Sequence, residues 1–428
     1  MIEAVTNLNR IVIIVMTLAY LYQILYLVVG LIYKNKKEEE TNAPFHRFAV
    51  LISARNEESV IGELVESLKK QKYPRNMFDI FVLADNCTDN TALCAKRAGA
   101  IVYERWNAQL VGKGYALDYL IKEIKNDYEK YDGYIVFDAD NVVDPNFIYE
   151  MNKTFEKGYD AITSYRNSKN FGTNWISAAY SIWFLREARF LNFPRMLLNT
   201  NCHISGTGFC ISDRIVEENG GWPYHLLTED IEFSVHCAIK GARIGYCDKA
   251  MVYDEQPVTF DQSWNQRMRW SKGFYQVNAN YMTSLVKGSL GKSKLKFSCY
   301  DMIMTTAPGM LLTLFIIAFN AVMIFACVTQ PYYIANVVMK RAGKFIVDTI
   351  VAFYIALLVY GVITVFSEWD MIQATAKKKL LYVVMFPVFM ATYIPISVAA
   401  LVKKVEWKPI QHFASENFTP SAAAAGKD

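Results

Sequence analysis

Two carboxylates stand two positions apart in Asp138-Ala139-Asp140, directly after the apolar segment 134–137. Because alternate side chains of an extended strand point to the same face, Asp138 and Asp140 are expected to face one side together. Two hard oxygen ligands of this kind can hold Mg²⁺ or Mn²⁺, ions that commonly bind phosphate oxygens as well. A solvated turn is the competing interpretation, and the apolar strand before the motif favours a metal site.

A second acidic position, Asp85, follows the apolar segment 81–84 and could accept hydrogen bonds from a uracil or a ribose. The segment 85–90 is rich in Asx and Thr residues, which also cap helices well, so both roles can coexist there. Lys113 lies between Gly112 and Gly114, and glycine lets the backbone come close to a ligand. We expect Lys113 to contact a diphosphate, with a solvated loop lysine as the alternative.

Thr228-Glu229-Asp230 precedes an amphipathic segment, 231–240, that is closed by Gly241 and predicts a helix. Acidic residues in a first turn also stabilise a helix by themselves, so the motif has a purely structural interpretation. The functional interpretation is catalysis, because the amino end of a helix stabilises an ionised carboxylate that can act as a general base. We assign the base to Asp230, with Glu229 and Thr228 beside it in the catalytic group.

Gln266, Arg269 and Trp270 are spaced i, i+3 and i+4, which places them on one face of a predicted helix. An arginine fork binds diphosphate oxygens well, and the face of an indole can stack on a sugar ring. An interfacial belt of tryptophan and arginine is the simpler alternative, although it leaves Gln266 unexplained. A loop that could approach the same sugar, with a plain turn as its alternative, is formed by Gly206, Thr207, Gly208 and Phe209.

Four apolar runs, at 11–33, 303–329, 345–366 and 380–402, approach the roughly 20 residues that cross a hydrocarbon core. A buried core helix is the alternative for any one of them. The sequence therefore predicts a transmembrane helix at 1–34, a soluble domain with interfacial helices at 35–285, a membrane block of about three helices at 286–402 and a short tail at 403–428.

The basic cluster at 34–37 predicts that the soluble domain of this multi-pass protein faces the cytoplasm, because lysine and arginine favour that side of a membrane. The lysines at 377–379 fit the same side, whereas those at 403, 404 and 408 conflict with a count of three later spans. The eight cysteines show no metal-binding spacing. A net charge of +4 without a nucleic-acid-binding motif argues against nucleic acid as a partner.

Short apolar strands alternate with amphipathic helices in the first half of the soluble domain. Strands are predicted at 48–53, 79–84, 101–104 and 134–137, and helices at 59–70, 90–98 and 115–124. This alternation is typical of a mostly parallel sheet covered by helices. Ligands of such sheets bind beyond the carboxyl ends of the strands, and Asp85 and Asp138 stand at two of those ends.

Together the motifs resemble those of membrane-bound family 2 glycosyltransferases, close to cellulose synthase and poly-N-acetylglucosamine synthase. The shared elements are Asp85, Gly112-Lys113-Gly114, Asp138-Ala139-Asp140, Gly206-Thr207-Gly208-Phe209, Thr228-Glu229-Asp230 and Gln266-Arg267-Met268-Arg269-Trp270. The resemblance implies an α/β GT-A (Rossmann-like) catalytic domain inserted between transmembrane segments. It also implies a UDP-sugar donor, a divalent metal and an inverting single displacement.

The resemblance also implies a role for each matching residue. Asp85 contacts the uridine, Asp138 and Asp140 hold the metal-diphosphate, and Asp230 is the base. Gln266 and Arg269 contact the donor diphosphate, and Trp270 contacts the acceptor sugar.

The function expected from this resemblance is processive synthesis of a β-linked polysaccharide, such as cellulose or a mixed-linkage glucan, coupled to export. The alternatives are a poly-N-acetylglucosamine synthase, a non-processive glycolipid glycosyltransferase and, from another class, a nucleotide-binding transporter or receptor. The expected partners are the UDP-sugar, the growing polysaccharide, the lipid bilayer and accessory membrane or export proteins. A single span before the catalytic domain is fewer than usual for the family. The segment 406–409 is a candidate substrate-gating segment.

Overall fold

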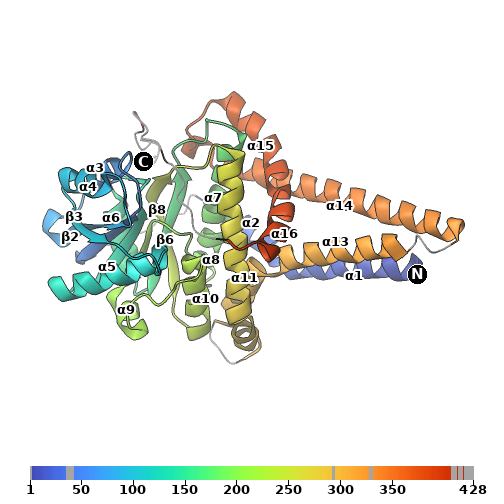
Figure 1. Cartoon of the computed structure of the whole chain (residues 1–428), viewed down its shortest axis with the longest axis horizontal. Helices are drawn as coiled ribbons and strands as arrows, with labels where there is room; N and C mark the ends of the chain where they lie inside the picture. The colour runs from blue at the N-terminus through green and yellow to red at the C-terminus, as the bar shows by residue number, and fades with distance from the viewer. Residues whose placement is uncertain are drawn as a thin grey trace.

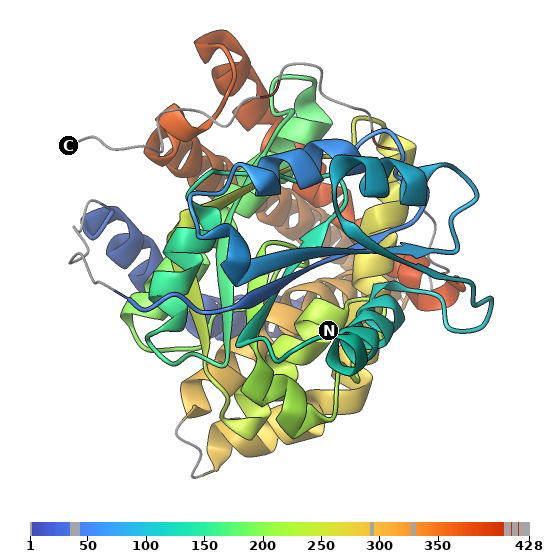
Figure 2. The same ribbon diagram turned by 90° about the vertical axis from the view of Figure 1, so that its left-hand side faces the viewer.

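An α/β domain and a set of long helices make up the molecule (Figure 1). The computed structural model describes residues 2–34, 43–291, 295–326, 331–405, 412 and 418. The candidate gating segment at 406–409 lies outside these residues. Turned by 90°, the view places the α/β domain in front of the long helices, which extend away behind it (Figure 2).

A mixed sheet in the order β3-β2-β1-β4-β7-β6-β8-β5 forms the centre of the α/β domain. Its strands are β1 (Phe48–Ala54), β2 (Phe78–Asp85), β3 (Ile101–Arg105), β4 (Gly133–Asp138), β5 (Val142–Val143), β6 (Ala161–Ser168), β7 (Phe209–Ser212) and β8 (Ile244–Asp254). The first four in this order are parallel neighbours, as the sequence predicts. Beyond them β7 runs antiparallel to both β4 and β6, β6 and β8 are parallel, and β5 is antiparallel to β8, so the second half of the sheet is mixed.

The helices of the first half confirm the alternating pattern within two or three residues. The predicted ones are α3 (Ile61–Lys69), α4 (Thr91–Ala98) and α5 (Lys113–Asp127), and α6 (Phe147–Phe155) is an additional helix. Their apolar faces cover the sheet, and the strand residues beneath them are almost completely buried. The second half adds α7 (Trp175–Glu187), α8 (Phe193–Leu197), α9 (Asp213–Asn219), α10 (Glu229–Lys240) and α11 (Phe260–Leu290).

The remaining helices are α1 (Ile2–Tyr20), α2 (Tyr22–Ile32), α12 (Lys296–Thr306), α13 (Pro308–Ala326), α14 (Tyr332–Ser367), α15 (Ala376–Ala391) and α16 (Tyr393–Val402). In the described residues, three helical segments are long and apolar enough to cross a membrane: Thr6–Ile32, Ala335–Ser367 and Ala376–Val402. The predicted span at 303–329 is instead divided between α12 and α13 just before Pro308, which has no N–H to continue the helix.

The helices α1, α13 and α14 contact one another and project away from the α/β domain (Figure 1). Asn9 of α1 and Asn320 of α13 exchange two hydrogen bonds between their side-chain amides, at 3.0 and 3.1 Å. At the other end of these helices, the buried Arg195 of α8 pairs with Asp301 of α12 at 2.7 Å. Tyr26 of α2 donates to the same carboxylate at 3.1 Å, so α2 and α12 are fixed to the α/β domain.

Candidate active site

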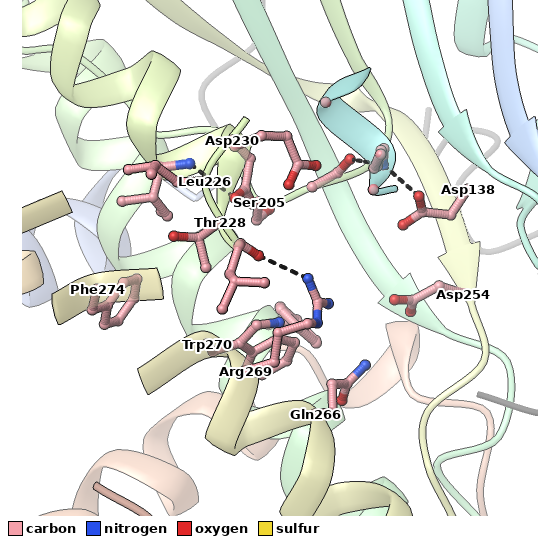
Figure 3. A pocket seen from close by; sticks show the side chains of 18 of the residues that line it. Asp138, Ser205, Leu226, Thr228, Asp230, Asp254, Gln266, Arg269, Trp270 and Phe274 are labelled. Carbon is pink, nitrogen blue, oxygen red and sulfur yellow. Dashed lines mark hydrogen bonds and ion pairs between the residues drawn. The ribbon is translucent and has the colours of Figure 1, made fainter. Parts of the chain in front are cut away.

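A cavity of about 1000 Å³ is lined by residues from the carboxyl ends of β1, β2 and β4 and from helices α10 and α11. Asp140, Asp230 and Trp270, which are far apart in the sequence, all line it. Figure 3 shows the side chains of Asp138, Asp230 and Arg269 directed towards a common space. The volume is at the upper end of the range for small-molecule sites, which suits two substrates held side by side.

The register of the parallel strands brings the first two acidic positions to one edge. Ser53 of β1 pairs with Leu83 of β2 on one side and with Asp138 of β4 on the other. Asp85 and Asp138 therefore flank the end of β1, and both line the cavity. Oδ1 of Asp85 accepts hydrogen bonds from Arg105 at 2.8 Å and from Asn86 at 3.1 Å. The second oxygen, Oδ2, is the one that remains for a ligand.

Lys113 is the first residue of α5, and its side chain lines the cavity and contacts two partners. Its Nζ donates to the Asp138 carboxylate and to the carbonyl oxygen of Gly206, the latter at 2.6 Å. The adjacent Gly114 is required by close packing, since a Cβ there would collide with the carbonyl oxygen of Tyr224. The predicted lysine between glycines therefore stands in the cavity as a positive charge beside the strand-end carboxylates.

Asp140 is buried at the back of the cavity, and its Oδ2 accepts a hydrogen bond from the backbone N–H of Glu255 at 2.8 Å. Although burial alone would raise it, the pKa of Asp140 is held below its ordinary value by the positive charges of His412 and Lys169. An ionised Asp140 and the partly exposed Asp138 are a hard oxygen pair that fits a divalent cation shared with phosphate oxygens. Within the described residues no group of three or more His, Cys, Asp or Glu side chains forms a complete metal cage, so the remaining ligands would be substrate oxygens and water.

The Thr228-Glu229-Asp230 motif lies at the amino end of α10 and lines the cavity. Oδ1 of Asp230 accepts a hydrogen bond from the backbone N–H of Ile231 at 2.8 Å, and Oδ2 faces Gly206. Burial raises the pKa of Asp230 above its ordinary value, against the opposing charges of Lys113 and Arg269. Burial, together with the neighbouring charge of Asp230, raises the pKa of Glu229 to about 7.

The face of α11 predicted from the i, i+3, i+4 spacing turns into the cavity, and Gln266, Arg269 and Trp270 all line it. Arg269 donates to the carbonyl oxygen of Leu227 at 2.9 Å, which holds its guanidinium beside the Thr228-Glu229-Asp230 motif. Oε1 of Gln266 is buried and accepts no hydrogen bond from the described residues. A buried acceptor without a donor is uncommon in folded proteins, and here it indicates a ligand group that donates to Gln266.

Trp270 packs edge-on against Tyr180 and Phe184, with ring centroids 5.8 and 6.2 Å apart. These contacts fix the indole while part of it lines the cavity. The contact of this indole with an acceptor sugar stays a prediction, and the packing shows that the ring is held in place.

The loop 206–209 reaches the cavity only at Gly206, which has a positive φ of 84° and whose carbonyl accepts from Lys113. Thr207, Gly208 and Phe209 are not among the residues that line it. The Thr207 hydroxyl accepts from the backbone N–H of Asp138 at 3.0 Å, and Phe209 begins β7 inside the core. The expected acceptor contacts of these three residues are therefore corrected to a supporting role, because the chain turns into the sheet immediately after Gly206.

Several cavity residues escaped sequence reasoning. Arg166 of β6 pairs with Asp254 of β8, His203 pairs with Glu187 at 3.0 Å, and all four line the cavity. His412, from the tail predicted at 403–428, also lines it and lies 3.0 Å from a carboxylate oxygen of Glu57. Glu57 could have been predicted, because it follows the carboxyl end of β1 and ligands of such sheets bind beyond the carboxyl ends of the strands.

Comparison with known proteins agrees with this geometry. Residues 46–273, more than half of the chain, match the family model described as "Glycosyltransferase like family 2", and the chain belongs to this family. A solved structure, a mannosyltransferase from Pyrobaculum calidifontis in complex with GDP-Man and Mn²⁺, aligns with a TM-score of 0.56 at 15% identity. The alignment covers 92% of this chain and 99% of that one, and it shows that the two share the GT-A fold.

Curated relatives are similar over the catalytic region. The chain is 26% identical over 281 residues to a beta-monoglucosyldiacylglycerol synthase from Nostoc sp., a match that covers 63% of this chain and 56% of that protein. It is 25% identical over 254 residues to a poly-beta-1,6-N-acetyl-D-glucosamine synthase from Staphylococcus aureus, covering 57% and 58%. The chain thus spans just over half the length of these relatives.

Proposed function

We propose that this protein transfers a hexosyl group from a UDP-sugar to a hydroxyl group at a membrane surface, with inversion at the anomeric carbon. The observation that carries the proposal is the cavity. One part of its wall holds Asp138, Asp140 and the base candidate Asp230. Another part holds Tyr20 and Gln23, which belong to the first candidate membrane span.

The proposed reaction is a single displacement. The acceptor hydroxyl attacks the anomeric carbon, its proton passes to a carboxylate oxygen of Asp230, and the bond from the sugar to the diphosphate breaks. The bonding electrons leave with the nucleoside diphosphate. A raised pKa makes Asp230 a stronger base than an exposed aspartate, while Lys113 and Arg269 keep its ionised form accessible and face the leaving diphosphate.

Asp138 and Asp140 would hold Mg²⁺ or Mn²⁺. When bound, the ion neutralises charge on the departing diphosphate. Lys113 pairs with the Asp138 carboxylate. We infer that donor binding draws Lys113 towards phosphate oxygens and frees Asp138 for the cation. The structural relative from Pyrobaculum contains Mn²⁺ with its nucleotide sugar, which supports this assignment.

Two acceptors remain candidates for the hydroxyl. A lipid acceptor is supported by the extension of the cavity to the membrane helices and by the relatives that make glucosyldiacylglycerol. A growing β-linked polysaccharide, either a glucan or poly-N-acetylglucosamine, is supported by the fixed indole of Trp270 and by the poly-N-acetylglucosamine synthase relatives. We further propose that the protein is multi-pass and that its catalytic domain faces the cytoplasm, where nucleotide sugars are made.

The test uses the full chain purified in detergent and given radiolabelled UDP-glucose and UDP-N-acetylglucosamine in separate reactions. The released UDP is measured, and the product is divided into lipid extract and polymer, which is then digested with linkage-specific hydrolases. Release of UDP with a labelled product supports the proposal. No UDP release from either donor, with lipid and oligosaccharide acceptors both supplied, would overturn it.

A further inference from the structure

The cavity continues past the catalytic group to a second end, which we call the membrane end. It is lined by Tyr20 of α1, Gln23 of α2, Trp183 and Arg186 of α7, and Thr305 of α12. Tyr20 and Gln23 belong to the candidate span Thr6–Ile32. A molecule placed here would therefore reach from the base Asp230 towards the headgroup layer of a bilayer.

Arg186 is the charged group that the membrane end offers. Its Nη2 donates to Oε1 of Gln23 at 3.1 Å. The guanidinium carbon lies 5.1 Å from the ring centroid of Trp183 and 4.9 Å from that of Tyr360 in α14. Contacts with α2 and α14 thus hold this cation at the junction of the α/β domain with two candidate spans, before any ligand arrives.

Among the described residues, the buried Arg267 also lacks a carboxylate partner, but it donates to three oxygen atoms, of Ser263, Phe389 and Thr392, and does not line the cavity. Four other enclosed arginines have their charge neutralised by a direct carboxylate partner. These pairs are Arg105 with Asp85, Arg166 with Asp254, Arg189 with Glu368, and Arg195 with Asp301. Arg186 has no such ion pair within the described part of the chain, and burial lowers its pKa. The adjacent Glu187 is directed to His203, 3.0 Å away. Arg267 meets the cost of burial with three oxygen acceptors, whereas Arg186 donates to one within the described residues and lines a cavity, where a ligand can supply an anion.

We propose that the membrane end binds the headgroup of an anionic membrane lipid, with Arg186 on its negatively charged group, and that this lipid supplies the acceptor hydroxyl. The proposal rests on the proposed function and names the acceptor class for it. The arginine fork matches phosphate oxygens. Because Arg186 and Asp230 line the same cavity, the headgroup must carry a hydroxyl as well as a charge. A phosphodiester lipid with a polyol headgroup meets both requirements. A neutral polysaccharide offers hydroxyl acceptors to the guanidinium but no negative charge to balance it.

Binding is tested first, apart from turnover. The full chain in neutral detergent is mixed with phosphatidylglycerol or with phosphatidylcholine, and the retained lipid is measured by native mass spectrometry. We expect retention of phosphatidylglycerol to fall at least tenfold in Arg186→Gln, and Arg186→Lys to recover part of it. Arg341→Gln is the matched control. Arg341 is an exposed arginine on α14, so this substitution removes the same charge outside the cavity.

Transfer is tested next in phosphatidylcholine vesicles with or without phosphatidylglycerol, with labelled donor and with soluble glycerol phosphate as a separate arm. We expect label in the lipid extract only when phosphatidylglycerol is present, and a lower ratio of lipid product to released UDP in Arg186→Gln. Equal retention by wild type and Arg186→Gln, or label on glycerol phosphate or a polymer instead of lipid, would overturn the inference. UDP release in those experiments would leave the proposed function standing, whereas its absence under all conditions would remove that function.

Discussion

The two ends of the cavity differ in how their charges are balanced. At the end with Asp85, Lys113 and Asp138, which we propose binds the nucleotide and call the nucleotide end, these charged groups have partners of opposite charge, whereas at the membrane end Arg186 has no carboxylate partner among the described residues. Asp85 pairs with Arg105, and Asp138 with Lys113. Within the described part of the chain, Gln23 is the one side chain to which Arg186 donates a hydrogen bond, and the rings of Trp183 and Tyr360 lie beside it. The first arrangement is preformed and electrically balanced, so its groups must exchange partners when a donor binds. In the second arrangement, we propose that the charge of Arg186 is balanced by a bound ligand.

This difference separates the chemistry from the choice of substrate. The edge of a parallel sheet is a rigid place for groups that must meet a diphosphate in a fixed geometry. The membrane end is built from helices outside the parallel part of the sheet, which include parts of candidate membrane spans. Changes at the nucleotide end and at the catalytic group should abolish turnover, and changes towards the membrane end should redirect it.

The largest effect is expected at the base. Asp230→Asn keeps the size of the side chain and removes the proton acceptor, so transfer should fall by about 10²–10⁴-fold. Asp261→Asn is the matched control, since Asp261 is also in the first turn of a helix but is exposed and outside the cavity. UDP release in the presence of acceptor is the measurement. An unchanged rate in Asp230→Asn would favour a protein that binds nucleotide without transferring sugar.

Loss of the metal should be the next largest effect. Chelation with EDTA should abolish transfer, and Mg²⁺ or Mn²⁺ should restore it. Asp140→Asn should weaken Mn²⁺ binding in the presence of UDP by at least about tenfold, the lower limit for residues that only support a metal ligand. Titration calorimetry measures this, with Asp144→Asn as control, because Asp144 has the same 6% exposure but does not line the cavity. Full turnover in EDTA would contradict the metal assignment.

Trp270→Ala should act on the acceptor more than on the donor. Loss of one aromatic contact of about 0.5–1.5 kcal/mol corresponds to a reduction of up to about tenfold. We expect that reduction in transfer, with hydrolysis of the donor by water affected less. Trp264→Ala on the same helix is the control, since Trp264 is outside the cavity. Equal losses of transfer and hydrolysis would assign Trp270 to packing against Tyr180 alone.

The smallest expected effect is a shift in the pH dependence of the rate. Asp230 must be ionised to accept a proton, and burial raises its pKa above the ordinary 3.8. The rate should therefore fall as the pH drops through a midpoint above 3.8, while the protein is still folded. Initial rates between pH 4 and 8, with circular dichroism at each pH, measure it. In Glu229→Gln, the acid side of the pH–rate profile should follow the titration of a single group, Asp230. A midpoint at or below 3.8 would show that the base is fully solvated.

Local sequence patterns were sufficient for the nucleotide end. Strands at 48–54, 78–85 and 133–138 follow from runs of apolar residues, and a parallel sheet brings the ends of such strands to one edge. The positions of Asp85 and Asp138 therefore followed without coordinates. The spacing of Gln266, Arg269 and Trp270 also determined that they share one face of a helix, because the helical period is fixed.

The partners of these groups were decided only by the tertiary structure. The antiparallel insertion of β7, the departure of Phe209 from the cavity, and the position of Arg186 between α2 and α14 all depend on contacts between segments far apart in the chain. Periodicity reports which face of an element is buried and says nothing of which distant element buries it. The sequence by itself thus determined the groups that perform the proposed chemistry, and only packing against the membrane helices decided where the cavity opens.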